Sequence, residues 1–273
     1  RERHGGPPMT THPTAPSKDM FPSRRVTRAL VMATSFLESR GIAAYLVGGC
    51  IRDHLLGRSS NDIDLAVAGD SLAIARDISA LLKGRLVVLD TSHGIARIVL
   101  GRNPNRWHLD IPGFPGTIEE DLARRDFTVN AMALELRLAL SGSRAIIDPL
   151  GGQKDLAVRL MRSVSEAAFR QDPVRLLRGV RLAHQLDFHL EEETANQIRR
   201  HAGLIKRASG ERVREELNAI MTGPGAAQAV LCLDSLGLLG NLFPELATTQ
   251  GVTQPKEHHW DVFQHSVEAL LAV

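Results

Sequence analysis

The stretch from Tyr45 to Val67, YLVGGCIRDHLLGRSSNDIDLAV, constrains the fold of this 273-residue chain more than any other part. A short apolar segment predicts a buried strand, the pair Gly48 and Gly49 opens a helix, and a second strand follows. The second strand alternates strictly, so Asp62 and Asp64 share one face while their apolar neighbours enter the core. The sequence therefore predicts a glycine turn beside a strand with paired carboxylates.

The rest of the chain divides into a mixed part and a helical part. Residues 23–150 combine helical periodicity with short strands, and one predicted helix begins at Ser71, which we expect to be its N-cap. After residue 150 the pattern is almost wholly helical, and residues 166–186 predict one continuous helix. Residues 1–22 are rich in Pro, Thr and Ser without an apolar core, which predicts a disordered lead-in and no signal peptide.

Composition restricts the class of protein only loosely. The formal net charge is +2, so no global field selects a partner. Cys50 and Cys232 are far apart and lack metal-site spacing, which predicts a reducing, cytoplasmic location. No run of 18 apolar residues indicates a membrane span. The chain starts without Met and stops inside an apolar run, so we expect a piece of a longer protein.

The carboxylates suggest metal chemistry. Asp62 and Asp64 repel each other unless a cation lies between them, and Mg²⁺ prefers carboxylate oxygens together with substrate phosphate. Asp110 lies on another predicted strand, and three acids on adjacent strands could hold two ions. In isolation, the alternative for Asp62 and Asp64 is a solvated edge strand or loop with two surface acids, and the alternative for Asp110 is a turn residue before Pro112.

The glycine turn suggests phosphate binding. Backbone amides at Gly48 and Gly49 could approach a phosphate at the start of the helix, and Arg52 could reach a triphosphate. A tight packing turn is the alternative interpretation. The stretch is neither a Walker loop nor a GxGxxG fingerprint.

Several motifs in order make the interpretation far more specific. The stretch GGCIRDHLLGRSSNDID is followed by RRDFTVNA from Arg124, IDPLGG from Ile147, QDPVRLLRGVRLA from Gln171 and ERVREEL from Glu211. Over about residues 25–222 the chain resembles the class II tRNA nucleotidyltransferase and poly(A) polymerase family. The resemblance implies an α+β fold. An N-terminal polymerase-β-like nucleotidyltransferase head, with a mixed sheet and helices, would precede all-α neck and body domains.

The resemblance implies a division of the chain and a role for each matching residue. The head would span 23–150, the neck 151–222, and the body with the start of an HD-like domain 223–273. Asp62 and Asp64 would bind the catalytic metal ions, with Asp110 as the third catalytic acid. The incoming nucleotide would be bound by Gly48, Gly49, Arg52, Arg125, Asp126, Asn130, Asp172, Arg175, Arg178 and Arg181.

Base choice would be made by a helix. In the family an EDxxR motif presents Asp and Arg to the Watson–Crick edge, which here corresponds to Asp172 and Arg175. Asp accepts from an exocyclic amine and Arg donates to a ring nitrogen or carbonyl, so the pair favours C and A. Gln171 replaces the usual Glu. Without the resemblance, a solvated helix with salt bridges explains the same residues.

Two further segments bear on the activity. The segment between Asp110 and Arg124 is short, as in members with an attached HD-type domain, some of which add only part of the CCA end. The tail HHWDVFQHSVEALLAV is similar to the opening of such a domain, with His265 as its first metal ligand, or is a helix with surface histidines.

The predicted function is template-independent transfer of CMP or AMP from CTP or ATP to the 3′ end of tRNA, with two Mg²⁺ ions. The helical half would hold the tRNA acceptor end through phosphate contacts of Arg199, Arg200, Lys206 and Arg207. A poly(A) polymerase and an RNA-binding protein with an inactive head are the alternatives. The sequence does not indicate the oligomeric state.

Overall fold

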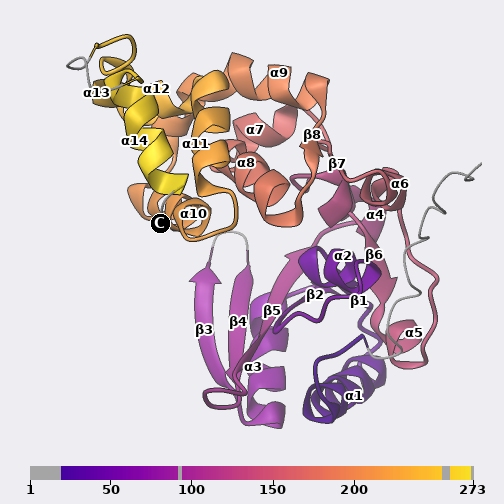
Figure 1. Ribbon diagram of the computed structural model, residues 1–273. Helices are drawn as coiled ribbons and strands as arrows, with labels where there is room; N and C mark the ends of the chain where they lie inside the picture. Colours follow the sequence, from indigo (N-terminus) through magenta and orange to yellow (C-terminus); the bar gives the residue numbers. More distant parts are fainter. Residues whose placement is uncertain (1–19, 92–93, 254–258, 272–273) are drawn as a thin grey trace, which may run out of the picture. The chain divides into compact units, whose positions relative to one another are not determined.

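The computed structural model describes residues 20–91, 94–253 and 259–271 (Figure 1). Most of the predicted disordered lead-in lies outside these ranges. The chain forms two compact units. Unit 1 comprises the chain up to Gly113 together with Glu135–Ala145, and unit 2 comprises Phe114–Leu134 and the chain from Ile146 onward.

A six-stranded sheet with the order β3-β4-β5-β2-β1-β6 dominates the first half of the chain. Pairing is antiparallel between β1 and β2, between β3 and β4, and between β4 and β5. Leu46, Leu65 and Ile98 are fully buried, so alternate positions of these strands form the core. The strands are β1 (Ala44–Val47), β2 (Asp62–Ala68), β3 (Arg85–Asp90), β4 (Ile95–Leu100), β5 (Trp107–Phe114) and β6 (Ala133–Glu135).

Helices α1 (Arg24–Ser39) and α3 (Ser71–Leu82) lie side by side, and α3 packs against the β3–β4 part of the sheet (Figure 1). The N-cap predicted at Ser71 is wrong, because the Asp70 side chain accepts from the Ala73 amide and caps α3. The Ser71 hydroxyl donates instead to the Gly94 carbonyl. A short helix, α5 (Leu136–Leu140), completes unit 1.

The glycine turn has the backbone that its sequence predicts. Gly48 has φ 73° and ψ −138°, a combination that a residue with a Cβ rarely adopts, and α2 (Gly49–Leu55) starts directly after it. The turn therefore needs glycine at position 48 to join β1 to α2.

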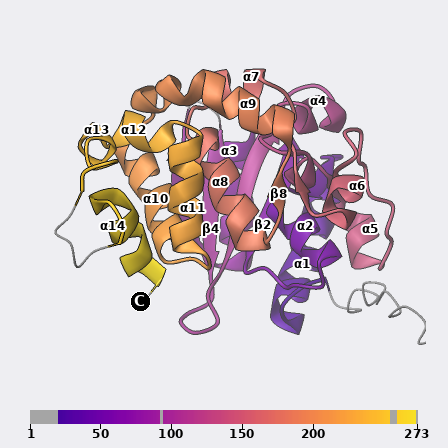
Figure 2. The ribbon, with the colours of Figure 1, turned by 45° about the horizontal axis from the view of Figure 1, so that its top comes forward.

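Unit 2 is mainly helical, and Figure 2 shows α8, α10 and α11 as neighbouring helices. Phe127 and Phe169 are fully buried with ring centroids 6.3 Å apart. The unit contains α4 (Ile118–Leu122), η1 (Thr128–Asn130), α6 (Gly152–Ala157), α7 (Ala167–Gln171), α8 (Arg175–Leu186), α9 (Glu192–His201), η2 (Ala202–Arg207), α10 (Gly210–Met221), α11 (Ala226–Ser235), α12 (Leu238–Leu242), α13 (Pro244–Ala247) and α14 (Val262–Leu271).

One prediction about this helical part is wrong, and one small sheet was not predicted. The neck is helical apart from β7 (Leu160–Met161) and β8 (His189–Leu190), which form a small parallel sheet. The predicted helix 166–186 is broken between α7 and α8. Asp172 has an extended backbone, with φ −144° and ψ 95°, because the ring of Pro173 excludes the helical conformation from the preceding residue.

The two compact units do not share their boundaries with the predicted domains, and the predicted division stays a prediction. The head was expected to extend to residue 150, whereas residues 114–134 and 146–150 belong to unit 2. The Thr128 amide donates to the Arg162 carbonyl, and Phe127 forms a β-bridge with Ser163, so the RRDFTVNA motif is fastened to the helical part. The finer separation into neck and body stays a prediction.

Candidate active site

The predicted site residues form two sets, one in each unit. Unit 1 contains the glycine turn and the three acids, and unit 2 contains the Arg-rich set from the RRDFTVNA and QDPVR motifs.

The three acids lie on neighbouring strands of the sheet. Asp62 and Asp64 alternate along β2 with buried Ile63, so the two carboxylates share one face. Strand β5 lies beside β2 and carries Asp110. The imidazole of His108, two residues before Asp110, contacts Asp62, which places Asp110 on the same face of the sheet as Asp62 and Asp64. We call Asp62, Asp64 and Asp110 the acid face.

Asp110 is bound by an arginine that the sequence analysis missed. Arg97 on β4 stands opposite Asp110 in the antiparallel register. Its Nε donates to Oδ1 at 2.7 Å and its Nη2 donates to Oδ2 at 2.8 Å. The hydrogen bond with Asp110 raises the pKa of Arg97 despite its partial burial, and the charges of Asp62 and Asp64 act in the same direction. Arg97 is therefore the direct partner of Asp110, and the charges of Asp62 and Asp64 add a smaller attraction.

Asp62 also has a partner that was not predicted. The Nδ1 atom of His108 lies 2.7 Å from Oδ1 of Asp62, whose side chain is 68% exposed. The signal was present in the sequence, because His108 precedes Asp110 by two residues and a strand places both on one face. What the sequence lacked was the adjacency of β5 and β2.

The acid face fits a divalent cation by its donor chemistry. Within the described ranges no group of three or more His, Cys, Asp or Glu side chains is arranged as a metal cage. Mg²⁺ does not need one, because it is commonly held by one or two carboxylates and completes its shell with water and substrate phosphate. Asp62 and Asp64 offer that arrangement, whereas Asp110 is engaged by Arg97.

The glycine turn holds Arg52 close to the protein interior. Arg52 is only 9% exposed, and its Nε donates to Oδ1 of Asp53 at 2.9 Å. A Cβ added at Gly49 would lie 3.4 Å from the Arg52 guanidinium, so glycine at this position avoids a close contact with the Arg52 side chain. Phosphate binding by Gly48, Gly49 and Arg52 stays a prediction.

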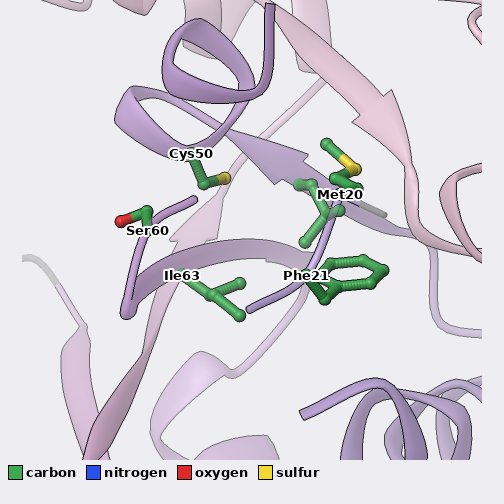
Figure 3. A pocket seen from close by; sticks show the side chains of 6 residues that line it. Met20, Phe21, Cys50, Ser60 and Ile63 are labelled. Carbon is green, nitrogen blue, oxygen red and sulfur yellow. The ribbon is translucent and has the colours of Figure 1, made fainter. Parts of the chain in front are cut away.

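A small hollow lies beside this turn (Figure 3). Among the residues that the structure describes, no charged side chain lines it, so this lining offers no counter-charge for a triphosphate. Its lining residues are Met20, Phe21, Leu46, Cys50, Ser60 and Ile63.

In unit 2, Asp126 is the centre of a buried hydrogen-bond network. Its Oδ1 accepts from the Phe127 amide at 2.8 Å and from Nδ2 of Asn130 at 3.1 Å, while Nη1 of Arg178 lies 3.4 Å from Oδ2. Burial raises the pKa of Asp126, but Arg178, the Phe127 amide and Asn130 together hold that pKa below its usual value. The carboxylate is ionised and fully engaged, which suits a scaffold for the neighbouring arginines.

Arg178 and Arg181 are joined to α10 through one acid. The Nε atoms of both arginines donate to the buried carboxylate of Glu216, one to each oxygen. Glu216 therefore fastens α8 to α10, and it is a residue to which the sequence analysis assigned no role. Arg125, in turn, pairs with Asp121 one helical turn earlier, at 2.9 Å.

The base-reading pair, Asp172 and Arg175, is present but not as two positions of one helix. Asp172 lies in the break before α8, whereas Arg175 is the first residue of α8. Nη1 of Arg175 donates to the carbonyls of Arg125 and Ala168, at 3.4 and 3.3 Å. The assignment of both residues to base recognition stays a prediction.

Of the cations predicted to hold tRNA phosphates, two are already paired. Arg200 bonds Glu166 and Glu193, and Arg199 donates to Asn196. Lys206 and Arg207 are exposed, and neither has a side-chain partner in the part of the chain that the structure describes.

The tail forms a helix, α14, from Val262 to Leu271. His265 lies on α14, so the helix expected there exists. Its role as a first metal ligand stays a prediction. Within residues 20–91, 94–253 and 259–271 no helix has the length and apolar character needed to cross a membrane.

Two family models match this chain. Residues 44–115 and 101–162 match the poly A polymerase head domain, and residues 187–249 match a model described as the probable RNA and SrmB-binding site of polymerase A. The mixed sheet with paired acids thus matches a poly A polymerase head domain, and the helices that follow match the RNA-binding model of the same family.

Curated relatives narrow the class. The chain is 44% identical over 232 residues to an A-adding tRNA nucleotidyltransferase of Deinococcus radiodurans, covering 83% of this chain and 51% of the relative. It is 40% identical over 213 residues to a CC-adding tRNA nucleotidyltransferase of Geobacter sulfurreducens, covering 78% and 48%. The chain belongs to the tRNA nucleotidyltransferase and poly(A) polymerase family. It spans about half the length of the curated relatives it matches.

Solved structures agree with this placement. A Thermotoga maritima CCA-adding enzyme complexed with tRNA superimposes with a TM-score of 0.71 at 30% identity, covering 85% of this chain and 55% of the other. A CCA-adding enzyme with ATP gives a TM-score of 0.70 at 28% identity over 85% and 55%. The α+β nucleotidyltransferase fold is confirmed, and nucleotidyltransferases of this family generally use a divalent metal ion.

Proposed function

We propose that the protein transfers CMP or AMP from CTP or ATP to the 3′ end of a tRNA. The observation that carries the proposal is the pair Asp62 and Asp64 on one face of β2, beside the strand of Asp110, in a chain of this family. Relatives named as A-adding and CC-adding, and a similar structure solved with tRNA, support the choice of substrate.

The reaction forms one phosphorus–oxygen bond and breaks another. The 3′ oxygen of the tRNA attacks the α-phosphorus, the bond to the β-phosphate oxygen breaks, pyrophosphate leaves, and the proton of the 3′ hydroxyl passes to solvent. Asp62 and Asp64 would hold Mg²⁺, two ions by our assignment, and the ions would supply charge neutralisation at the phosphates. The bound ions would also offset the negative charge of Asp62 and Asp64, which would otherwise repel the triphosphate.

Unit 2 would recognise the base and the RNA. Asp172 and Arg175 would read the Watson–Crick edge, in a setting held by Asp126, Arg178 and Glu216. Exposed Lys206 and Arg207 would contact tRNA phosphates, so tRNA binding should weaken as salt rises. A cytoplasmic location is part of this proposal.

A poly(A) polymerase is the second candidate, because the matching head and RNA-binding models both carry that description. The two candidates differ in the nucleotides that they incorporate. Only the first needs a base-reading site that accepts C as well as A.

The test is to incubate the full chain with tRNA lacking its 3′ end, Mg²⁺ and one NTP at a time, and to read the products at nucleotide resolution. One or two C additions indicate CC addition, a single A added to a tRNA ending in CC indicates A addition, and both indicate CCA addition. A long A ladder favours the polymerase. A folded chain that incorporates nothing contradicts both.

A further inference from the structure

The carboxylate of Asp172 is held by an arginine from a distant helix. Nη1 of Arg212 donates to Oδ1 at 3.0 Å, and Nη2 donates to Oδ2 at 2.7 Å. Arg212 is the third residue of α10, forty positions along the chain from Asp172. Two parallel bonds from one guanidinium orient the plane of a carboxylate, which a single ammonium contact does not do.

The two-pronged bond from Arg212 leaves Asp172 able to accept another hydrogen bond. Each carboxylate oxygen has two lone pairs, and Oδ1 also accepts from the Val174 amide at 3.3 Å. Arg175 approaches Oδ2 only to 3.8 Å. Oδ2 therefore keeps one lone pair beyond its bond to Arg212. The position and direction of that lone pair are set by the Arg212 fork.

The same bond also favours the ionised form of the Asp172 carboxyl group. Burial raises the pKa of Asp172, but the hydrogen bonds and charge of Arg212, with the charge of Arg175, bring that pKa below its ordinary value. An ionised carboxylate only accepts, whereas a protonated one also donates. An acceptor matches the exocyclic amines of cytosine and adenine, and it opposes the carbonyl groups at the same positions of uracil and guanine.

Arg212 is not needed merely to join helices α8 and α10. Helices α8 and α10 are already joined by Glu216, which is buried and accepts from Arg178 and Arg181. The Arg212 side chain is 49% exposed, so it adds little buried packing between those helices. Its distinctive contact is the two-pronged bond to Asp172.

We propose that Arg212 is a positioning residue for base selection, which orients the Asp172 carboxylate so that it accepts from cytosine or adenine and disfavours uracil and guanine. This inference rests on the proposed function, in which Asp172 reads the base. Arg212 itself need not touch the nucleotide.

The test compares Arg212→Ala and Arg212→Lys with Arg214→Ala. Arg214 is exposed on the same helix and has no side-chain partner in the described part of the chain, so its removal controls for the lost charge. The measured quantity is the ratio of kcat/KM for CTP over UTP, and for ATP over GTP, with the full chain and a tRNA acceptor. We expect Arg212→Ala to lower the CTP or ATP preference by about tenfold or more, and Arg214→Ala to leave it unchanged.

Arg212→Lys separates charge from geometry. It keeps the positive charge but loses the fork, so most of the selectivity should still be lost. Unchanged selectivity in Arg212→Ala, or full selectivity in Arg212→Lys, overturns the inference.

A double-variant cycle tests whether Arg212 acts through Asp172. Asp172→Asn should lower selectivity alone, and adding Arg212→Ala should cause no further loss. Additive losses would mean that Arg212 acts independently of Asp172 and would contradict the proposed role. Thermal unfolding of each variant, with a melting temperature near that of the wild type, excludes loss of fold as the cause.

Equilibrium binding of CTP, UTP, ATP and GTP to the same variants distinguishes a failure of this inference from a failure of the proposed function. A wild-type chain that binds CTP or ATP selectively but transfers nothing contradicts the proposed function, and the Arg212 comparison is then read from the binding ratios. A wild-type chain that binds all four nucleotides equally overturns the role of Arg212.

Discussion

Arg97 and Asp110 face each other across neighbouring antiparallel strands and form a two-pronged ion pair, with donor–acceptor distances of 2.7 and 2.8 Å. The Asp110 side chain is 16% exposed and that of Arg97 is 34% exposed. The pair holds the third acid of the acid face in a fixed position while the other two acids remain on the adjacent strand.

Removing Arg97 should destabilise the protein because Asp110 would remain partly buried without its counter-charge. We expect Arg97→Ala to lower the free energy of unfolding by about 1–3 kcal/mol, toward the low end because Arg97 is partly exposed. Chemical denaturation of Arg97→Ala and of Arg85→Ala provides the measurement. Arg85 lies exposed on β3 and has no side-chain partner within the described ranges. Equal stability of the two variants would contradict the prediction, and Arg97→Ala/Asp110→Asn should recover part of the loss.

Gly48 is expected to tolerate no side chain. Its φ of 73° with ψ of −138° is strained for any residue with a Cβ, so Gly48→Ala should cost about 1–3 kcal/mol. Gly210 is the matched control, because an added Cβ there meets nothing within 4 Å and Gly210 is not among the glycines with positive φ. Gly210→Ala, within α10, should be neutral or slightly stabilising. Similar melting temperatures for the two variants would argue against a strained turn.

Local patterns predicted the acid-bearing part of the fold well. The two strands predicted within Tyr45–Val67 are observed as β1 and β2, and the helix predicted to begin at Ser71 is α3, because each is specified by a short apolar repeat and a glycine or polar boundary. Alternation along β2 was enough to place Asp62 and Asp64 on one face.

Partners that are distant along the chain could not be predicted in the same way. Arg97 and Asp110 are separated by 13 positions, Arg212 and Asp172 by 40, and His108 and Asp62 by 46. These contacts depend on strand order and helix packing, which periodicity does not contain.

The break at Asp172 had a local signal that helical periodicity outweighed. Pro173 disfavours a helical conformation at Asp172, yet the apolar repeat continues on both sides of the break. As a result Asp172 was assigned to the face of a continuous helix. In the break, Asp172 accepts a hydrogen bond from Arg212 of α10.

Acid should weaken the protein partly through Asp126. The folded-state pKa of Asp126 is below its ordinary value of 3.8, so the unfolded chain takes up the proton first as the pH falls. Its stabilisation is complete well above pH 3.8 and is lost as the pH falls through that value toward the folded-state pKa.

Asp126→Asn should therefore lower the free energy of unfolding at pH 7 by about 1–3 kcal/mol and flatten its decline below about pH 5. Urea denaturation between pH 3 and pH 7 is the measurement. Glu192→Gln, at an exposed position of α9, is the control and should keep the wild-type pH profile. An Asp126→Asn profile parallel to that of the wild type would show that Asp126 does not contribute to acid sensitivity.

The role of the acid face in catalysis is tested most directly by comparing nucleotide transfer and tRNA binding in the wild type and in Asp64→Asn. The full chain is given tRNA lacking its 3′ end, Mg²⁺ and labelled CTP or ATP, and Asp187→Asn, at a side chain that is 90% exposed, is the control. We predict labelled tRNA with the wild type and the control. With Asp64→Asn we predict a rate lower by about a thousandfold or more and an unchanged dissociation constant for tRNA. Transfer by Asp64→Asn at the wild-type rate would contradict the assignment of the acid face as the catalytic centre.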